Sequence, residues 1–386
     1  MTASEPIPLA RPDLGPREEE LLLEVLHTGQ LSLGPVLERF ERDFADWLGT
    51  DDAVAVSSGT AALHLGVRAL EWGKGDEVVT TPFSFVSSAN CLLYEDVTPV
   101  FCDIDPLTLN MDPDAAGAAV TERTAGLLPV HIFGYPAAME ELERLAADRS
   151  LGILEDAAEA AGAVDETGVR VGRRGNNAIF AFYANKQLVT GEGGIAIPSD
   201  GSVAERMRSE RNQGRARDMG WLGHERLGFN YRLTDLQSAM GVAQVERADE
   251  LIAARDRVAA LYASALGALG AAPAGEGDPD DLVLGCPDRG EGRRSWFVYV
   301  LQLPAGIDRD AVMASLAGEG IDSKAYLPCI HLQPPYRERF GFKAGEFPVA
   351  ERVAERSLAL PFFASMTESQ IDRVCTALGE ALGKQL

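Results

Sequence analysis

Short apolar runs alternate with amphipathic stretches through the first half of the chain. Residues 54–70 begin with a β-branched run, pass through a Ser/Gly turn and continue as an Ala- and Leu-rich helical pattern. Helical patterns also end near Tyr94 and cover residues 139–148, and the apolar runs between them predict strands at residues 77–82, 99–105, 125–134 and 152–156. Strands that alternate with helices are typical of a mostly parallel sheet with helices on both faces. The predicted fold class is therefore α/β.

The pattern changes on both sides of this region. Residues 16–48 carry two helical patterns, and the helical stretch that follows Arg232 is long enough to bridge two domains. Further on, residues 295–303 form a strand-like run among helices. We therefore expect a large domain over residues 1–250, including the N-terminal helical segment, and a smaller C-terminal α+β domain over residues 251–386.

Two apolar, strand-like runs at residues 178–182 and 194–197 surround Lys186, and a Gly-rich stretch joins them. This arrangement predicts a hairpin or a strand–loop–strand unit. The chain has only five lysines among its 35 Lys and Arg residues, so it normally uses arginine where it needs a positive charge. Arginine cannot lose its proton, whereas a desolvated lysine can become a neutral, nucleophilic amine. Lys186 is therefore a candidate nucleophile, and the alternative is a lysine that reaches from a strand end into solvent.

Polar residues also follow the predicted strands at their carboxyl ends, where ligands of such sheets bind. Ser57, Ser58, Gly59 and Thr60 lie where a strand passes into a helix. The first N–H groups of a helix lack intrahelical partners, and the helix dipole favours an anion beside them. This turn is therefore a candidate phosphate cradle, although many α/β crossovers share the pattern without binding an anion.

An acidic and an aromatic position complete the candidate site. Asp156 ends a predicted strand, so it is either a helix cap or a buried carboxylate paired with a cation, and Glu159 would share its surroundings. Phe83 and Phe85 flank Ser84, so they would face the same side of an extended strand. Core packing is the ordinary role for such a pair, and a ring that stacks on a flat cofactor is the alternative.

Charge and cysteine content narrow the function classes. The net charge of −24 argues against general binding to nucleic acid or anionic membranes, so an anionic ligand needs a local basic cluster. Residues 201–232 offer one, with seven arginines against four acidic residues. No apolar run approaches a membrane span, the first 30 residues lack a signal-peptide pattern, and the five cysteines show neither metal-ligand nor disulfide spacing. We expect a cytoplasmic protein without a metal site.

Five motifs resemble the DegT/DnrJ/EryC1/StrS family, a group of pyridoxal-phosphate (PLP) sugar aminotransferases. They occur in the family's order and spacing, as VSSGTAALH, TPFSFVSSAN, ILEDAAEAAG, FAFYANKQLVTGEGG and LGFNYRLTDLQSA. The similarity extends from IPLARPDLG near the start of the chain to LPFF near its end. The resemblance implies the type I aminotransferase fold and a homodimer whose two active sites lie at the subunit interface.

The resemblance assigns roles to the candidate residues. Lys186 matches the lysine that forms the Schiff base with PLP, and Asp156 matches the carboxylate that binds the pyridine nitrogen. That ion pair keeps the ring protonated, so that it can accept electrons. Phe85 matches the ring that stacks on PLP. Glu159 stands near the PLP ring hydroxyl, where other members carry Gln or His, and in this it is similar to the perosamine-synthase branch.

The phosphate end shows one departure from the family. The phosphate turn is matched by Ser58, Gly59 and Thr60, and Asn230 matches a residue that reaches the phosphate of the neighbouring subunit's cofactor. Members commonly have Ser five residues before the catalytic lysine, where this chain has Ala181. Either PLP binds less tightly as a result, or Ser57, Ser58 or a water takes the place of that hydroxyl.

The resemblance also suggests the substrates. L-Glutamate is the expected amino donor, and a nucleotide-linked keto sugar is the expected acceptor, in amino-sugar or polysaccharide biosynthesis. We expect Tyr326 and His331 to contact the substrate, and Arg232, with Arg211 or Arg215, to hold its phosphates. The open alternatives are amination of a keto cyclitol or another cyclic ketone in antibiotic synthesis, and a catalytically silent regulatory protein with a PLP fold. For the arginines, the alternative is local pairing with Glu210, Asp218 and Glu225.

Overall fold

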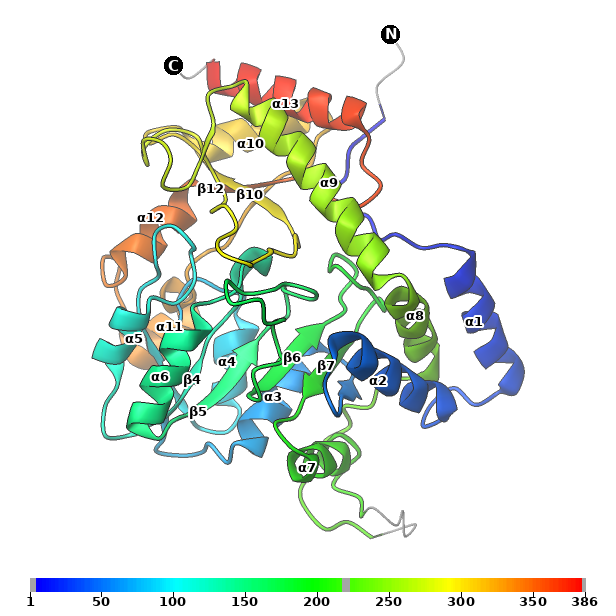
Figure 1. Cartoon of the computed structure of the whole chain (residues 1–386). Helices are drawn as coiled ribbons and strands as arrows, with labels where there is room; N and C mark the ends of the chain where they lie inside the picture. The colour runs from blue at the N-terminus through cyan, green and yellow to red at the C-terminus, as the bar shows by residue number, and fades with distance from the viewer. Residues whose placement is uncertain (1–4, 217–222, 384–386) are drawn as a thin grey trace.

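The computed structural model describes residues 5–216 and 223–383, which fold around two β-sheets (Figure 1). The larger sheet has seven strands in the order β1-β7-β6-β5-β4-β2-β3. They share one direction except β7, which is antiparallel to both β1 and β6. The predicted, mostly parallel α/β sheet is thus confirmed, with the strands β1 (Val54–Val56), β2 (Glu77–Thr80), β3 (Thr98–Phe101), β4 (Thr124–Leu128), β5 (Gly152–Asp156), β6 (Asn177–Ala181) and β7 (Gly194–Ile197).

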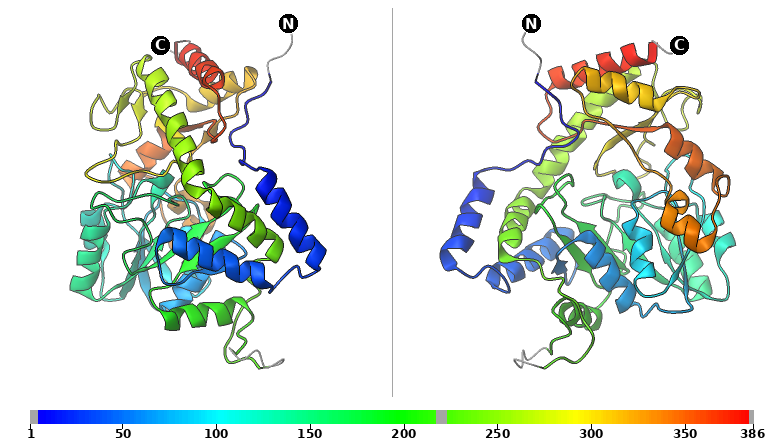
Figure 2. Two further views of the ribbon diagram at one scale, coloured as in Figure 1. Left: turned by 45° about the vertical axis from the view of Figure 1, so that its right-hand side comes forward. Right: turned by 180° about the vertical axis from the view of Figure 1, so that it is seen from behind.

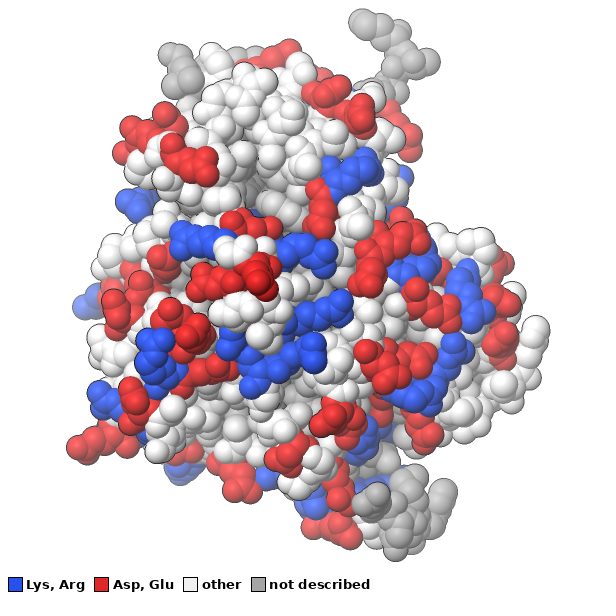
Figure 3. Space-filling view, viewed as in Figure 1, with Lys and Arg blue, Asp and Glu red and all other residues white. Residues whose placement is uncertain are grey.

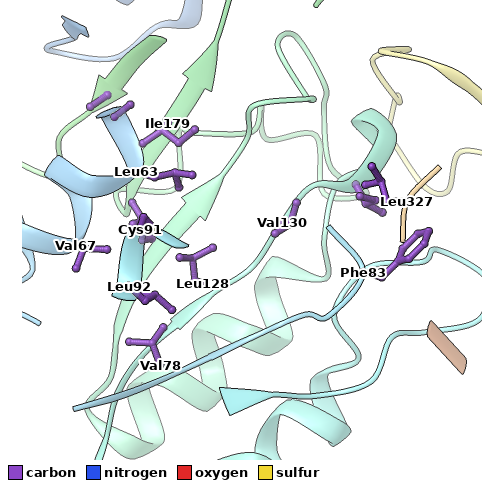
Figure 4. Close-up of a cluster of buried hydrophobic side chains, with 14 of the residues drawn as sticks. Leu63, Val67, Val78, Phe83, Cys91, Leu92, Leu128, Val130, Ile179 and Leu327 are labelled. Atoms are coloured by element: carbon purple, nitrogen blue, oxygen red, sulfur yellow. The ribbon is translucent and has the colours of Figure 1, made fainter. Parts of the chain in front are cut away.

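Both faces of this sheet are buried, because successive strand residues point into different apolar clusters. On β1, Val54 and Val56 pack into one cluster while Ala55 packs into another. The first cluster lies under helix α3 (Gly59–Ala69) and is shown in Figure 4. The second lies under α2 (Pro35–Leu48) and α8 (Asp235–Glu246). The remaining helices of the larger part are α1 (Pro16–Thr28), α4 (Ser87–Leu93), α5 (Pro113–Ala119), α6 (Met139–Arg149) and α7 (Gly201–Arg211).

The second sheet has five strands in the order β11-β12-β10-β9-β8. A third apolar cluster holds it against helices α9, α10 and α13, and Ile7 near the N-terminus joins that cluster and pairs with Ile321. The division into two domains at residue 250, which the sequence analysis expected, stays a prediction. The elements of this part are α9 (Ala248–Gly267), β8 (Ala272–Pro273), β9 (Val283–Leu284), β10 (Tyr299–Gln302), α10 (Arg309–Gly318), β11 (Lys324–Ala325), α11 (Pro334–Phe340), α12 (Pro348–Arg356), β12 (Ser357–Leu360) and α13 (Glu368–Gly383).

The helical stretch predicted after Arg232 is two helices rather than one. Helices α8 and α9 meet at Arg247, whose backbone leaves the helical conformation with φ −117° and ψ 12°. Figures 1 and 2 show α9 running from the flank of the larger sheet to the second sheet. A side chain near its start can therefore contact both parts of the molecule.

Acidic side chains are numerous on the face of the molecule that is seen in Figure 1. Figure 3 shows acidic side chains across the whole of one face, with basic side chains gathered across its middle. Within residues 5–216 and 223–383, no helix combines the length and the apolar character needed to cross a lipid bilayer.

Candidate active site

A cavity of about 480 Å³ opens at the carboxyl ends of the parallel strands, where the sequence places its candidate residues. Its wall comes from the turn before α3, the segment before α4, the segment after β5 and the loop between β6 and β7. Phe297 and Leu327, from the part of the chain that holds the second sheet, complete it. The predicted residues that line the cavity are Ser58, Gly59, Thr60, Phe85, Asp156, Glu159, Lys186 and Tyr326.

The turn before α3 supplies hydroxyl and N–H groups to this wall. The Ser58 side chain accepts a hydrogen bond from the N–H of Ala61 and so caps α3. The N–H groups of Gly59 and Thr60 belong to the first helical turn, where no intrahelical acceptor is available. A Cβ on Gly59 would lie only 2.7 Å from that of Ala181, so glycine is required by this close approach.

Asp156 is buried at the end of β5. Its Oδ2 accepts a hydrogen bond of 2.7 Å from the Ser88 hydroxyl, and its Oδ1 accepts one of 3.1 Å from the N–H of Ala158. Burial raises the pKa of Asp156, and the Ser88 hydrogen bond offsets this only in part. Residues 157–162 form turns in the described chain, so the helix-cap interpretation of Asp156 is wrong.

Lys186 also faces the cavity rather than the solvent, since its side chain is only 13% exposed. Its Nζ lies 3.6 Å from Oε1 of Glu159 and 3.8 Å from the centre of the Phe297 ring. Burial lowers the pKa of Lys186, and the attraction of Glu159 partly opposes that change. The amine is therefore poised to become the neutral nucleophile, and the interpretation as a lysine that reaches into solvent fails.

Glu159 links this amine to a neighbouring loop. Its Oε2 accepts a hydrogen bond of 2.8 Å from the N–H of Phe133, whose φ of +53° is rare for a residue with a side chain. Burial raises the pKa of Glu159, and the nearby Lys186 lowers it in part. The Glu159 side chain therefore holds both a reactive group and a strained turn.

The two phenylalanines around Ser84 separate, contrary to the prediction that they share a face. Phe83 is fully buried against Phe133, whereas Phe85 is 61% exposed at the cavity. The reason is that the chain bends over residues 82–84 instead of staying extended, and the N–H of Phe83 donates to the Thr81 hydroxyl.

The sequence analysis expected His331 to contact the substrate, but the structure places this side chain away from the cavity. Its side chain is completely buried, packs against Phe347 and lies 3.1 Å from Oε1 of Glu351. A side chain without exposed surface cannot touch a ligand in the cavity. The structure places it in the interior, against Phe347 and Glu351.

Arg211 is likewise structural, because it is buried and its guanidinium donates to Glu41 and to the carbonyl of Ala55. Among the described residues that line the cavity, neither Asn230 nor Arg232 appears. Asn230 is exposed, and Arg232 donates a hydrogen bond of 3.1 Å to Asn212. Asp218, a possible local partner of the arginines, lies outside the described residues.

The sequence analysis predicted no role for Ser88, Phe297 or Arg255, which contact the central residues of the site. Ser88 holds Asp156, the Phe297 ring covers the Lys186 amine, and Arg255 of α9 donates a hydrogen bond of 2.9 Å to the main-chain carbonyl of Lys186. Ser88 lies within the motif TPFSFVSSAN, so its position was available as a signal. Arg255 and Phe297 belong to patterns that are ordinary for a helix and a strand.

Comparison with known proteins agrees with this geometry. The DegT/DnrJ/EryC1/StrS aminotransferase family matches residues 12–379. The GDP-perosamine synthase of Caulobacter vibrioides is 36% identical over 379 residues, which cover 97% of this chain and 98% of the relative. The spore coat polysaccharide biosynthesis protein SpsC of Bacillus subtilis is 35% identical over 385 residues and covers 96% of both chains.

Solved structures give the same result. The structure of DesI in the presence of its TDP-sugar product has a TM-score of 0.88 and 32% identity, with 99% of this chain and 94% of that one covered. The structure of 3-amino-5-hydroxybenzoic acid synthase has a TM-score of 0.89 and 30% identity, with 99% and 100% covered. These similarities confirm the type I aminotransferase fold.

The residues of the cavity fit PLP. A buried carboxylate suits the pyridine nitrogen, an amine with a lowered pKa suits the aldehyde, and the turn before α3 suits the phosphate. The chain belongs to the DegT/DnrJ/EryC1/StrS aminotransferase family and is a PLP-dependent aminotransferase.

Proposed function

We propose that this enzyme transfers an amino group from L-glutamate to a nucleotide-linked keto sugar. The observation that carries the proposal is the Lys186 amine, buried beside Glu159 in the same cavity as Asp156. The chain's similarity to GDP-perosamine synthase and to DesI, crystallised with its TDP-sugar product, supports the sugar acceptor. A cyclic ketone without a nucleotide is the second candidate, because the chain is also similar to 3-amino-5-hydroxybenzoic acid synthase.

Each catalytic role follows from the surroundings of one side chain. PLP, when bound, supplies an aldehyde carbonyl and a ring that accepts electrons. Lys186 would hold the cofactor at that carbonyl and would move a proton between the donor's Cα and the cofactor carbon, because burial lowers the pKa of its amine. Asp156 holds the proton at the pyridine nitrogen, and the Ser88 hydroxyl fixes the carboxylate in place.

Arg255 has a positioning role in this proposal. Its guanidinium is buried and donates to the carbonyls of Lys186 at 2.9 Å and Phe297 at 3.2 Å. These are the two residues whose side chains meet at the Lys186 amine, 3.8 Å from the Phe297 ring centre. One side chain of α9 therefore fixes both members of that contact.

A shared site at a dimer interface is part of the proposal. Phe85 and Tyr183 line the cavity and are exposed in the single chain, and the Leu227 side chain is exposed as well. Leu227 belongs to the same motif as Asn230, which is also exposed. Such exposure fits a surface that a second copy covers, with Asn230 reaching the partner's cofactor.

The acceptor is tested with the pyridoxamine form of the enzyme and a panel of nucleotide-linked keto sugars and free cyclic ketones. We expect L-glutamate to bleach the yellow holoenzyme, and a nucleotide-linked sugar to restore the colour and yield an amino sugar. Lys186→Ala should show no multiple turnover. Colour restored by free cyclic ketones but by none of the nucleotide sugars would favour the second candidate.

Asp156→Asn keeps the shape of the side chain and removes its charge. We expect kcat to fall by at least about 100-fold, since a preorganised charge at the reacting ring is lost, with little change in melting temperature. Ser88→Ala removes one donor to the carboxylate and should cost kcat about tenfold. Near-wild-type kcat for Asp156→Asn would show that the carboxylate does not serve the cofactor.

Arg255→Met keeps an unbranched side chain of similar length but leaves the carbonyls of Lys186 and Phe297 without this donor. We expect kcat to fall about tenfold while the KM for both substrates stays within about twofold, because the amine and not the substrate site is displaced. Arg255→Lys should recover part of kcat. A loss of melting temperature with unchanged kcat would assign Arg255 to folding alone.

Complementation tests the shared site. Lys186→Ala and Asn230→Ala/Arg232→Ala are each expected to be inactive, and they are unfolded, mixed and refolded together. In a two-fold dimer about half of the molecules are mixed, and each of these has one site without a lesion, so about a quarter of all sites should work. Activity that stays at the parental level, with mixed dimers confirmed by mass spectrometry, would mean that each site is built from one chain.

A further inference from the structure

At the turn before α3, the cavity lacks the serine hydroxyl that family members commonly carry at the position of Ala181. It contains another hydroxyl, that of Ser87, which has no role in the function proposed above. Ala181 lines the cavity beside Gly59, where a Cβ on the glycine would lie 2.7 Å from its own. The hydroxyl that family members carry at this position is therefore missing right at the phosphate turn. A charged phosphate gains more from such donors than a neutral ligand does.

The serine hydroxyls that line the cavity have different partners. Ser84 and Ser88 lie 2.8 Å apart, and Ser88 donates to Asp156, so this pair serves the carboxylate. The Ser58 side chain caps α3 by accepting from the N–H of Ala61. Ser87 differs from all three, because its hydroxyl lies 2.8 Å from that of Thr60 at the phosphate turn.

The Thr60–Ser87 pair has a proton to spare. Two hydroxyls carry two protons, and a hydrogen bond between them uses one. The other proton is available to a ligand, and it is polarised because its oxygen accepts the first bond. Both residues line the cavity, and Ser87 is half-buried at the start of α4, so the free proton can point to an anion at the turn.

We propose that Thr60 donates to the Ser87 hydroxyl and that Ser87 donates its own proton to the cofactor phosphate, in place of the hydroxyl that Ala181 lacks. Because the Ser87 oxygen accepts the hydrogen bond from Thr60, the Ser87 O–H is polarised and donates a stronger hydrogen bond to the anion. The proposal depends on PLP as the cofactor and not on the identity of the amino acceptor.

Binding to the apo-protein tests it without turnover. PLP and pyridoxal, which has no phosphate, are titrated into wild type and Ser87→Ala by absorbance. We expect Ser87→Ala to weaken PLP binding at least about tenfold, as a lost hydrogen bond to a charged group should, and to change pyridoxal binding by less than about twofold. Ala is a good helix former, so α4 should persist, and the melting temperature of the apo-protein checks this.

Ser84→Ala is the matched control, because its hydroxyl lies in the same cavity but serves the carboxylate. Any effect of this variant should be equal for PLP and pyridoxal. If Ser87→Ala binds PLP as wild type does, or weakens both ligands equally, the proposal is wrong.

Ala181→Ser tests the replacement directly. We expect this change to tighten PLP binding by less than about threefold in wild type, where Ser87 already fills the place, and to recover most of the loss in Ser87→Ala. Equal gains in both backgrounds would show that the two positions act independently, which would overturn the replacement. These titrations contain no amino acceptor, so a negative result would not bear on the proposed keto-sugar acceptor. A negative result in the acceptor assay would likewise not bear on the role of Ser87.

Discussion

Burial of three ionisable side chains in one cavity is the constraint on which the chemistry of this protein depends. Desolvation raises the pKa of Asp156 and Glu159 and lowers the pKa of Lys186. An uncompensated buried charge costs several kcal/mol, so each group is held by neighbours. Ser88 and a main-chain N–H support Asp156, and the Phe133 N–H supports Glu159. Burial therefore favours the neutral form of the Lys186 amine, and the two carboxylates beside it favour a cationic ring in the cavity.

The α/β sheet explains why these groups can meet. Parallel strands bring the ends of β1 and β5 to one edge, and β7 returns antiparallel between β1 and β6. The loop between β6 and β7 therefore carries Lys186 back over the strand ends, toward Asp156. Because both faces of the sheet are buried under helices, this edge is where the strands can present polar groups to a ligand.

The part of the chain that holds the second sheet completes the wall of the cavity and positions the Lys186 amine. Phe297 and Tyr326 line the cavity, and Arg255 of α9 binds the main chain on both sides of the Lys186–Phe297 contact. A change in the orientation of the second sheet relative to the first would therefore move the groups that position the Lys186 amine.

The sequence alone determined the α/β sheet and the turn before α3, and it singled out Lys186 as a candidate nucleophile, whereas it left Asp156 open between a helix cap and a buried carboxylate. These features depend on local patterns: alternating apolar runs, a Ser/Gly turn at a helix start, and a lysine in an apolar segment of a chain that prefers arginine. The positions of Phe83 and Phe85, the burial of His331 and Arg211, and the contacts of Ser87, Ser88 and Arg255 were decided by the tertiary structure. Each of these depends on a bend or on a partner from another element, such as Asp156 for Ser88 or the Lys186 carbonyl for Arg255. A hydroxyl or guanidinium looks the same in sequence whether it faces water or a buried acceptor, and only folding decides which of the two it meets.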